Sequence, residues 1–271
     1  MTVGTPAAPS TTSRVPQKIE SVSLMPREHG AYGQLFLPLV VALAFGSPRA
    51  SAVAIAVSAT LMFFAHEPML VLLGHRGAKK KTSLRQRALR RFGVLASASA
   101  ALGLFAFIHS ENVTRAALAM TALLGGLMHA LVLAKREKTV LGETAALLVL
   151  SAVSVPISLA SGCSLELALH AWAAWIVAFL AANSAVRMSI QNQKRGPVRL
   201  EWVLLVGAIL LGAVGLLRTP LAASAWPVQL GAVAVAFARP HPKHLKRVGW
   251  TLASLSVLTG TALVVMARSL V

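Results

Sequence analysis

Histidine and glutamate stand side by side at two places in an otherwise apolar sequence. The stretch "PREHGAYGQLF" puts Glu28 and His29 at the edge of a hydrophobic run, and "FFAHEPML" puts His66 and Glu67 inside another. An imidazole next to a carboxylate can accept and return a proton near neutral pH, so these pairs are candidates for acid–base chemistry. Glu143, at the start of a later apolar run, adds one more carboxylate. The candidate catalytic residues are Glu28, His29, His66, Glu67 and Glu143.

Six further polar residues are candidate ligand-binding groups because they stand within or against apolar runs. Polar side chains are costly inside a bilayer, so they usually face protein or water and mark function. Asn183, Arg187 and Gln191 are spaced by four residues and therefore share one face of a helix. Guanidinium groups hold a phosphate or carboxylate by charge-assisted hydrogen bonds. The candidate set is Arg27, Arg76, His129, Asn183, Arg187 and Gln191.

Several other chemistries are excluded by residues that the chain lacks. It contains no aspartate, which excludes a Ser-His-Asp triad in its usual form. Cys163 is the only cysteine, so there is no intrachain disulfide framework and no cysteine-rich metal site. Histidine and glutamate suit zinc, iron or manganese, but no HxxxH or HExxH pair stands on one helix. We therefore assign no metal site and leave the cofactor open.

The composition places these residues in a membrane protein. Hydrophobic residues make up 56% of the chain, charged residues 13%, and the mean hydropathy is +0.71, values outside the range of soluble domains. The net charge of +18 comes from basic residues in short segments between apolar runs, which is the pattern that orients a membrane protein. We expect membrane lipids as partners and no nucleic acid.

Proline, glycine and charge clusters divide the apolar sequence into runs of spanning length. The chain is predicted to be an all-α, polytopic membrane helical bundle of about nine transmembrane helices. The polar residues 1–26 predict a disordered cytoplasmic tail, and 27–271 a single transmembrane domain. The predicted spans are 32–46, 50–74, 92–108, 113–134, 141–160, 166–191, 200–217, 221–238 and 248–267.

The basic residues predict the orientation of this bundle. Twenty-one of the 26 lie in the N-terminal tail and in alternate loops, four lie on the opposite side, and Arg187 lies within a span. Positively charged loops remain in the cytoplasm, so the N-terminus is predicted inside and the C-terminus outside. We expect a multi-pass protein of the inner (cytoplasmic) cell membrane. The basic stretch "SLRQRALRRF", with Thr82 or Ser83 as its helix cap, is either an anchor on anionic headgroups or a cap over a cavity.

Helix geometry places the candidate residues in the cytoplasmic half of the membrane. His66 and Glu67 precede the end of their span by about eight residues, or roughly 12 Å, and His129 lies roughly 9 Å from the same surface. In the outer half, His170 is the one ionisable residue predicted well inside a helix. This asymmetry predicts a water-accessible polar cavity that opens to the cytoplasm.

Each candidate also has a structural interpretation, which stays open. His66 and Glu67 can satisfy each other across helices, and His129 can be a packing residue beside Gly125 and Gly126. Glu143 can be a first-turn acid favoured by the helix dipole, with Glu137 on the loop surface. Arg187 can extend to the membrane surface, and Asn183 can bond a neighbouring helix. Tyr32 is interpreted as an interface anchor.

Two resemblances to known families extend this interpretation. The stretch "PREHGAYGQLFLPLVVALAFG", followed by "FFAHEPML", resembles the YwiC-like family of bacterial integral membrane proteins. The nine-helix architecture, with polar groups at the cytoplasmic ends of the second and sixth spans, is more distantly similar to UbiA-type intramembrane prenyltransferases. Those enzymes carry aspartate-rich, magnesium-binding motifs there, whereas "AHEPMLVLLGHR" and "ANSAVRMSIQNQKR" contain none. Ordinary magnesium-dependent prenyl transfer is therefore disfavoured.

Three classes of function remain open from the sequence. The first is an intramembrane protein that binds or modifies an anionic lipid or isoprenoid, with Arg76 and Arg187 on the headgroup and the His-Glu pairs transferring protons. The second is a carrier of a small solute or ion, which is expected to place its polar site near the midplane of the bilayer. The third is a structural subunit whose polar residues hold helices together.

Overall fold

The computed structural model describes residues 24–26, 29–193 and 196–269. Within these residues the chain is helical and has no strand, which confirms the predicted all-α membrane bundle. Predictions for 1–23, Arg27 and Glu28 lie outside the described residues. The helices are α1 (His29–Phe45), α2 (Ala50–Leu73), α3 (Ala78–Ile108), α4 (Asn112–Leu133), α5 (Val140–Ala152), α6 (Ser154–Ala160), α7 (Leu165–Gln193), α8 (Arg199–Leu216), η1 (Pro220–Ala225), α9 (Trp226–Ala238), η2 (Pro242–His244) and α10 (Leu245–Ser269).

Eight helical segments are long and apolar enough to cross a membrane, and α1 is a shorter apolar helix. Together they correspond to the nine predicted spans. Two predicted spans are each built from two helices: α5 with α6, and η1 with α9. The α5–α6 break lies just before Pro156, which has no N–H to donate to the carbonyl of Ala152. Proline at the start of α9 likewise suits a first helical turn.

The basic stretch after α2 differs from the prediction. No separate helix begins at Thr82 or Ser83, because α3 starts at Ala78 and runs unbroken for 31 residues. Thr82 donates its hydroxyl to the Ala78 carbonyl at 3.1 Å, as a residue within a helix does, and caps nothing. The basic stretch is therefore the first part of a long helix whose second part is apolar.

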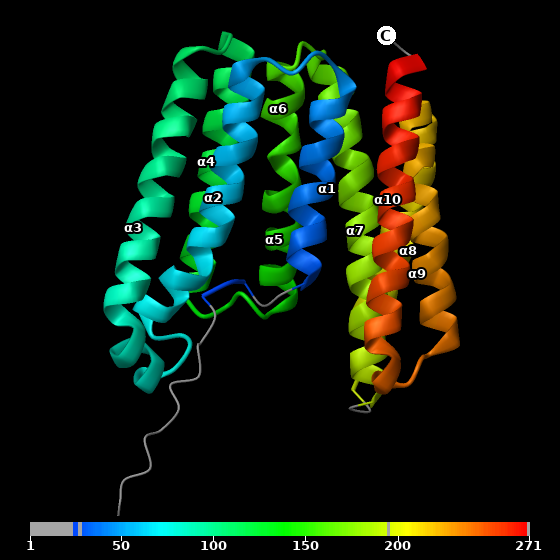
Figure 1. Cartoon of the computed structure of the whole chain (residues 1–271). Coiled ribbons are helices and arrows are strands. Elements are labelled where there is room, and N and C mark those ends of the chain that lie inside the picture. The colour runs from blue at the N-terminus through cyan, green and yellow to red at the C-terminus, as the bar shows by residue number, and fades with distance from the viewer. Residues whose placement is uncertain (1–23, 27–28, 194–195, 270–271) are drawn as a thin grey trace, which may run out of the picture.

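The connections alternate between the two ends of the bundle (Figure 1). The start of α1 and the α2–α3, α4–α5, α7–α8 and α9–α10 connections share the lower end in that view, and the other connections and the C-terminus share the upper end. We call the lower end the basic end, because its loops are those for which the sequence predicts a cytoplasmic location. Residues 24–26 also lie there, and Leu24 is buried against Val71 and Ala88.

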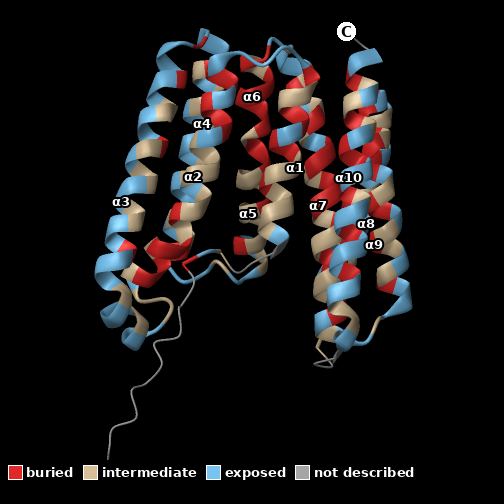
Figure 2. Ribbon diagram, in the orientation of Figure 1, coloured by how far each residue is buried: buried red, intermediate tan, exposed pale blue. Residues whose placement is uncertain are grey.

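The packed core is concentrated in the upper part of the bundle and along α7 (Figure 2). Trp175 of α7 is completely buried among Val41, Leu147 and Leu263. Close approach of α1 and α10 requires Gly260, where a Cβ would lie 2.9 Å from the Val41 side chain. These contacts join α1, α5, α7 and α10 into one unit that positions the polar residues at the basic end.

Candidate functional site

Glu67 and Arg76 form a bidentate ion pair where α2 ends. Gly74 adopts a left-handed conformation with φ 85°, and the His75 N–H donates to the Leu70 carbonyl, so the chain turns back on the helix. Arg76 then donates from Nε to Glu67 Oε1 at 2.8 Å and from Nη2 to Oε2 at 2.5 Å. Glu67 is only 2% exposed. Both of its oxygens are occupied, and the charge of Arg76 is compensated.

His66 and His129 face each other beside this ion pair. Their ring centroids are 6.3 Å apart in an edge-to-face arrangement. His129 donates from Nδ1 to the Gly125 carbonyl at 2.7 Å, which leaves Nε2 as its second ring nitrogen. The His66 side chain is half-buried and makes no hydrogen bond with any other residue in the described ranges. It is therefore the group of this cluster most available to a ligand.

Glu137 joins the same cluster from the α4–α5 loop, although the sequence suggested a surface position. It lies near His66, as do Glu67, Arg76 and His129. Its Oε2 is buried and has no hydrogen-bond partner among the residues described. The loop is held against α5 because Gly142 leaves room for the backbone of Arg136 and Glu137. We call these five residues the α2–α4 cluster: His66, Glu67, Arg76, His129 and Glu137.

A second cluster lies between α5, α7 and α8. Arg187 donates from Nη1 to Glu143 Oε2 at 2.7 Å and from Nε to Glu201 Oε1 at 3.4 Å. Gln191 donates from Nε2 to the same Glu201 oxygen at 2.8 Å. Two carboxylates thus share one guanidinium. We call Glu143, Arg187, Gln191 and Glu201 the α7 cluster.

The remaining candidate residues belong to neither cluster. Asn183 lies one turn from Arg187 on α7, half-buried, and its side chain makes no hydrogen bond within the described part of the chain. His29 is the first residue of α1, and only its backbone is described. The other described candidate residues are thus divided between two ion-paired clusters, and a single shared cavity stays a prediction. No group of three or more His, Cys or acidic residues suited to a metal ion occurs in the described ranges.

Aromatic side chains line α1 and α2 near the α2–α4 cluster. Tyr32 contacts Phe63 edge to face at 5.0 Å between centroids, and Phe36 and Phe64 complete the group. The Tyr32 hydroxyl donates to the Pro26 carbonyl at 3.1 Å. Its ring contacts Phe63 and therefore packs at the α1–α2 interface. All four aromatic rings are half-buried.

Burial differs between the two halves of the central α5–α6 segment. Most of α6 is fully buried, whereas most of α5 after Gly142 is half-buried (Figure 2). The central α5–α6 segment is therefore less buried toward the basic end, which is the end that holds the ionisable residues.

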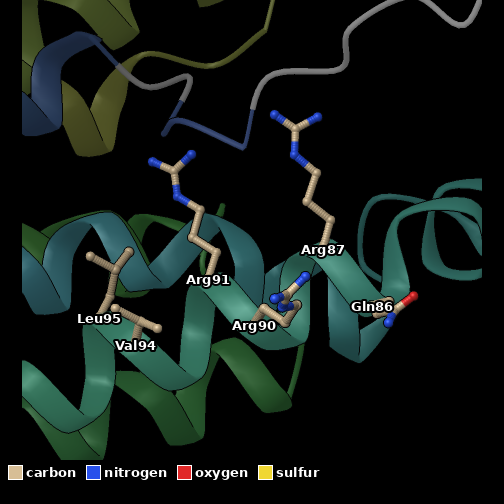
Figure 3. A pocket seen from close by; sticks show the side chains of 6 residues that line it. All are labelled: Gln86, Arg87, Arg90, Arg91, Val94 and Leu95. Carbon is tan, nitrogen blue, oxygen red and sulfur yellow. The ribbon is translucent and has the colours of Figure 1, made fainter.

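A cationic groove lies on the first part of α3. It has a volume of about 560 Å³ and is lined by Gln86, Arg87, Arg90, Arg91, Val94 and Leu95. Figure 3 shows Arg87 and Arg91 extending in the same direction, with Arg90 turned away from them. α3 contains no acidic residue, and these arginines form no ion pair with any described side chain. Among the described residues, Arg91 donates a hydrogen bond only to Met25 Sδ, a weak acceptor, at 3.0 Å.

The groove lies at the same level of the bundle as the α2–α4 cluster. Ser58 and Ser99 exchange hydrogen bonds at 2.8 Å, from each hydroxyl to the opposite carbonyl, and fix the antiparallel register of α2 and α3. The same register places Arg91 level with His66. The sequence predicts either an anchor or a cap over a cavity for this stretch, and it assigns ligand binding to Arg76 and Arg187. In the structure, glutamates engage both of these arginines.

Sequence reasoning also missed Glu201 as a member of the site. The sequence indicates this position through the shortness of the α7–α8 connection, since two helices joined by few residues pack against each other near that connection. Glu201 therefore lies beside Arg187 and Gln191. Glu137 carried no comparable signal, because its burial depends on how the α4–α5 loop folds.

These features define a polytopic helical membrane protein with ionisable residues gathered toward one end. A family profile described as YwiC-like protein matches residues 25–158, so over this region the chain is similar to the YwiC-like family. The match includes α1 to α5 and the α2–α4 cluster, whereas α7 and α8 lie beyond it. No curated protein and no solved structure matches the chain. The similarity to UbiA-type enzymes stays a prediction.

Proposed function

We propose that the protein binds an anionic amphiphile, a phospholipid or an isoprenoid phosphate, at the basic end of the bundle. The observation that carries this proposal is the α3 groove, which Arg87, Arg90 and Arg91 line without a carboxylate partner among the described residues, with Arg87 and Arg91 extending in the same direction. Uncompensated guanidinium groups attract phosphate strongly and bind it in a fixed geometry. Each basic residue near an anionic membrane surface contributes about 1 kcal/mol of attraction.

The arrangement of α3 suits a headgroup and a tail together. Val94 follows Arg90 by four residues, and Leu95 follows Arg91 by four, so each arginine has an apolar neighbour one turn further along the helix. Val94 is 67% exposed. A phosphate at the arginines and an alkyl chain along Val94 and Leu95 would follow the direction in which α3 enters the apolar layer.

Arg76 and Arg187 are less suited to hold the headgroup. Glu67 occupies Arg76 in a bidentate pair, and Glu143 and Glu201 surround Arg187 with an excess of negative charge. An anion at either place would compete with a carboxylate that is already bound. These two arginines therefore hold helices together in our proposal, and the α3 arginines bind the ligand.

A chemical step on the bound amphiphile would use His66. Its imidazole is half-buried, level with Arg91, and beside His129. A neutral imidazole can take a proton from a substrate hydroxyl, and the imidazolium that results can give the proton to a leaving group. Glu67 cannot share this role while both of its oxygens accept from Arg76. The Tyr32–Phe64 aromatic group supplies apolar surface for a tail nearby.

The proposal is tested by native mass spectrometry of the purified protein with its co-isolated lipids. The triple variant Arg87→Gln/Arg90→Gln/Arg91→Gln should lose the anionic lipid adducts that the wild type retains. A matched control, Lys79→Gln/Lys80→Gln/Arg85→Gln, removes three charges from the same helix outside the groove and should retain them. Adding inorganic phosphate to delipidated protein separates headgroup recognition from lipid binding. If both variants lost their anionic lipid adducts equally, general surface charge would explain the binding, and the proposal would be overturned.

A carrier is the second candidate, favoured by the two carboxylates that share one guanidinium in the α7 cluster. Unbalanced buried charge inside a span is a feature of ion and proton pathways. Movement of protons or charge through the purified protein in sealed vesicles would favour the carrier. A bound lipid without such movement would favour the first proposal.

A further inference from the structure

A polar pocket lies at the end of the bundle opposite the basic end, where the α1–α2 and α3–α4 connections meet (Figure 1). Its volume of about 300 Å³ is at the lower end of the range for small-molecule sites. Five polar residues of its wall carry the inference: Arg49, Ser51, Ser110, Glu111 and Thr114. We call it the Ser110 pocket.

The hydroxyl of Ser110, in the α3–α4 connection, has no partner in the described part of the chain. Its Oγ is buried, and the residue is only 9% exposed. A buried hydroxyl without a hydrogen bond is costly and calls for an explanation. Ser51 and Thr114 are also buried in the wall of this pocket, and their side chains make no hydrogen bond with a described residue. Three hydroxyl groups from three elements therefore surround one pocket with their donors unused.

Two long helices begin at the same pocket. α2 starts at Ala50 and α4 at Asn112, and the side chains of the preceding residues, Arg49 and Glu111, cap neither first turn. The N–H groups of an uncapped first turn need acceptors from elsewhere. Each helix N-terminus also acts as about half a positive elementary charge, so the two together supply about one. The pocket therefore combines free donors with a positive potential.

The charged side chains around the pocket leave this potential in place. Arg49 Nη1 contacts Glu111 Oε1 at 3.4 Å, and the two side chains are 65% and 83% exposed. Such an exposed pair contributes little and rearranges easily, unlike the buried pair at the end of α2. Arg115 of α4 donates to the Phe107 and Ile108 carbonyls, both at 2.9 Å, and so compensates the negative end of α3. An anion in the pocket would displace only the weak contact of Glu111.

We propose that the Ser110 pocket binds a phosphate group, held by the first-turn N–H groups of α2 and α4, the Ser110 hydroxyl and the Arg49 guanidinium. Phosphate oxygens accept hydrogen bonds in several directions, and helix N-termini are favourable sites for them. The group belongs either to free inorganic phosphate or to a phospholipid headgroup, because the pocket lies at a membrane surface, the one predicted to face outside. Binding changes no covalent bond. The site is independent of the α3 groove, which lies at the other end of the bundle.

Isothermal titration calorimetry of delipidated protein with inorganic phosphate tests the proposal. The variant Arg87→Gln/Arg90→Gln/Arg91→Gln serves as the starting protein, so that phosphate at the α3 groove does not contribute. Added to it, Arg49→Gln should weaken binding by about tenfold or more, and Ser110→Ala by up to roughly tenfold. Glu111→Gln should strengthen binding, because it removes the carboxylate that competes for Arg49. The matched control Arg218→Gln removes an exposed charge from the α8–η1 connection at the same end and should leave the affinity unchanged.

The same titration with a short-chain phosphatidylglycerol distinguishes the two sources of phosphate. Binding of inorganic phosphate would identify a site for the free ion. Binding of the lipid alone, weakened by Arg49→Gln and Ser110→Ala, would identify a headgroup site. Binding of neither compound, or binding that both substitutions leave unchanged, would overturn the proposal.

The melting temperature of Ser110→Ala separates a binding role of the hydroxyl from a structural one. Without phosphate it should equal or exceed that of the starting protein, because the substitution removes a buried hydroxyl that has no partner. Phosphate should raise the melting temperature of the starting protein and have a smaller effect on Ser110→Ala. A lower melting temperature of Ser110→Ala without phosphate would show that the hydroxyl stabilises the fold itself, and would contradict the proposal.

Discussion

Replacing Glu67 by glutamine isolates the contribution of the ion pair that closes α2. The substitution keeps the shape of the side chain and removes its charge, so Arg76 loses its ionic partner and one of its two acceptors, which now lie at 2.8 and 2.5 Å. Two opposite charges about 4 Å apart attract by about 4 kcal/mol at an effective dielectric constant of about 20. Arg76 is 20% exposed, so water recovers part of this energy.

We therefore expect Glu67→Gln to lower the free energy of unfolding by about 2 to 3 kcal/mol, toward the lower end of values for breaking a buried pair. For a protein of this size each kcal/mol corresponds to roughly 2–4 °C, so the melting temperature should fall by about 4 to 12 °C. Differential scanning fluorimetry of the purified protein in detergent measures the shift.

The matched control is Glu111→Gln, which makes the same change in the ion pair between Arg49 and Glu111. That pair is 3.4 Å long, and its side chains are 65% and 83% exposed, so its loss should cost less than about 1 kcal/mol. Equal shifts in the two variants would refute the reasoning, because a buried bidentate pair and an exposed one would then be equivalent. The double variant Glu67→Gln/Arg76→Gln should recover part of the loss.

Three further predictions follow from other parts of the structure. Gly46→Ala should destabilise the protein by about 1–3 kcal/mol, because its Cβ would overlap the Ser161 carbonyl, whereas Gly207→Ala, with open space around it, should be neutral or stabilising in the same melting assay. Gln229→Met should cost about 1 kcal/mol through the lost 2.8 Å bond to the Ala208 carbonyl, and an unchanged melting temperature would contradict this. Burial raises the pKa of the Cys163 thiol, so its alkylation should be slow at neutral pH and accelerate as pH rises. Because Cys163 lies in the α6–α7 connection, a membrane-impermeant maleimide should label it from outside intact cells. Labelling only after lysis would reverse the predicted orientation.

The helices were largely predictable from the sequence because apolar length and turn residues decide them. The nine predicted spans agree with the structure to within a few residues at most ends, and α3 is the main exception. There the sequence changes from basic to apolar at Phe92, and this change was interpreted as the start of the span. The helix is continuous because nothing between Ala78 and Phe92 interrupts it: the stretch contains no proline, and its residues favour helices.

The site was predictable only in part. The sequence identified most of the ionisable residues at the basic end, because charge inside an apolar run is conspicuous. It did not show that Glu67 pairs with Arg76, since this depends on the left-handed turn at Gly74. Nor did it show that Glu143 and Glu201 converge on Arg187, which requires three helices to be placed in space. The partner of each arginine depends on the tertiary structure, and it determines which arginines remain available to bind a ligand.

A density map of the protein in lipid nanodiscs that contain anionic phospholipid tests the central claim most directly. We expect headgroup density at Arg87, Arg90 and Arg91, continuous with alkyl density along Val94 and Leu95. Headgroup density at Arg187 with an empty α3 groove would contradict it.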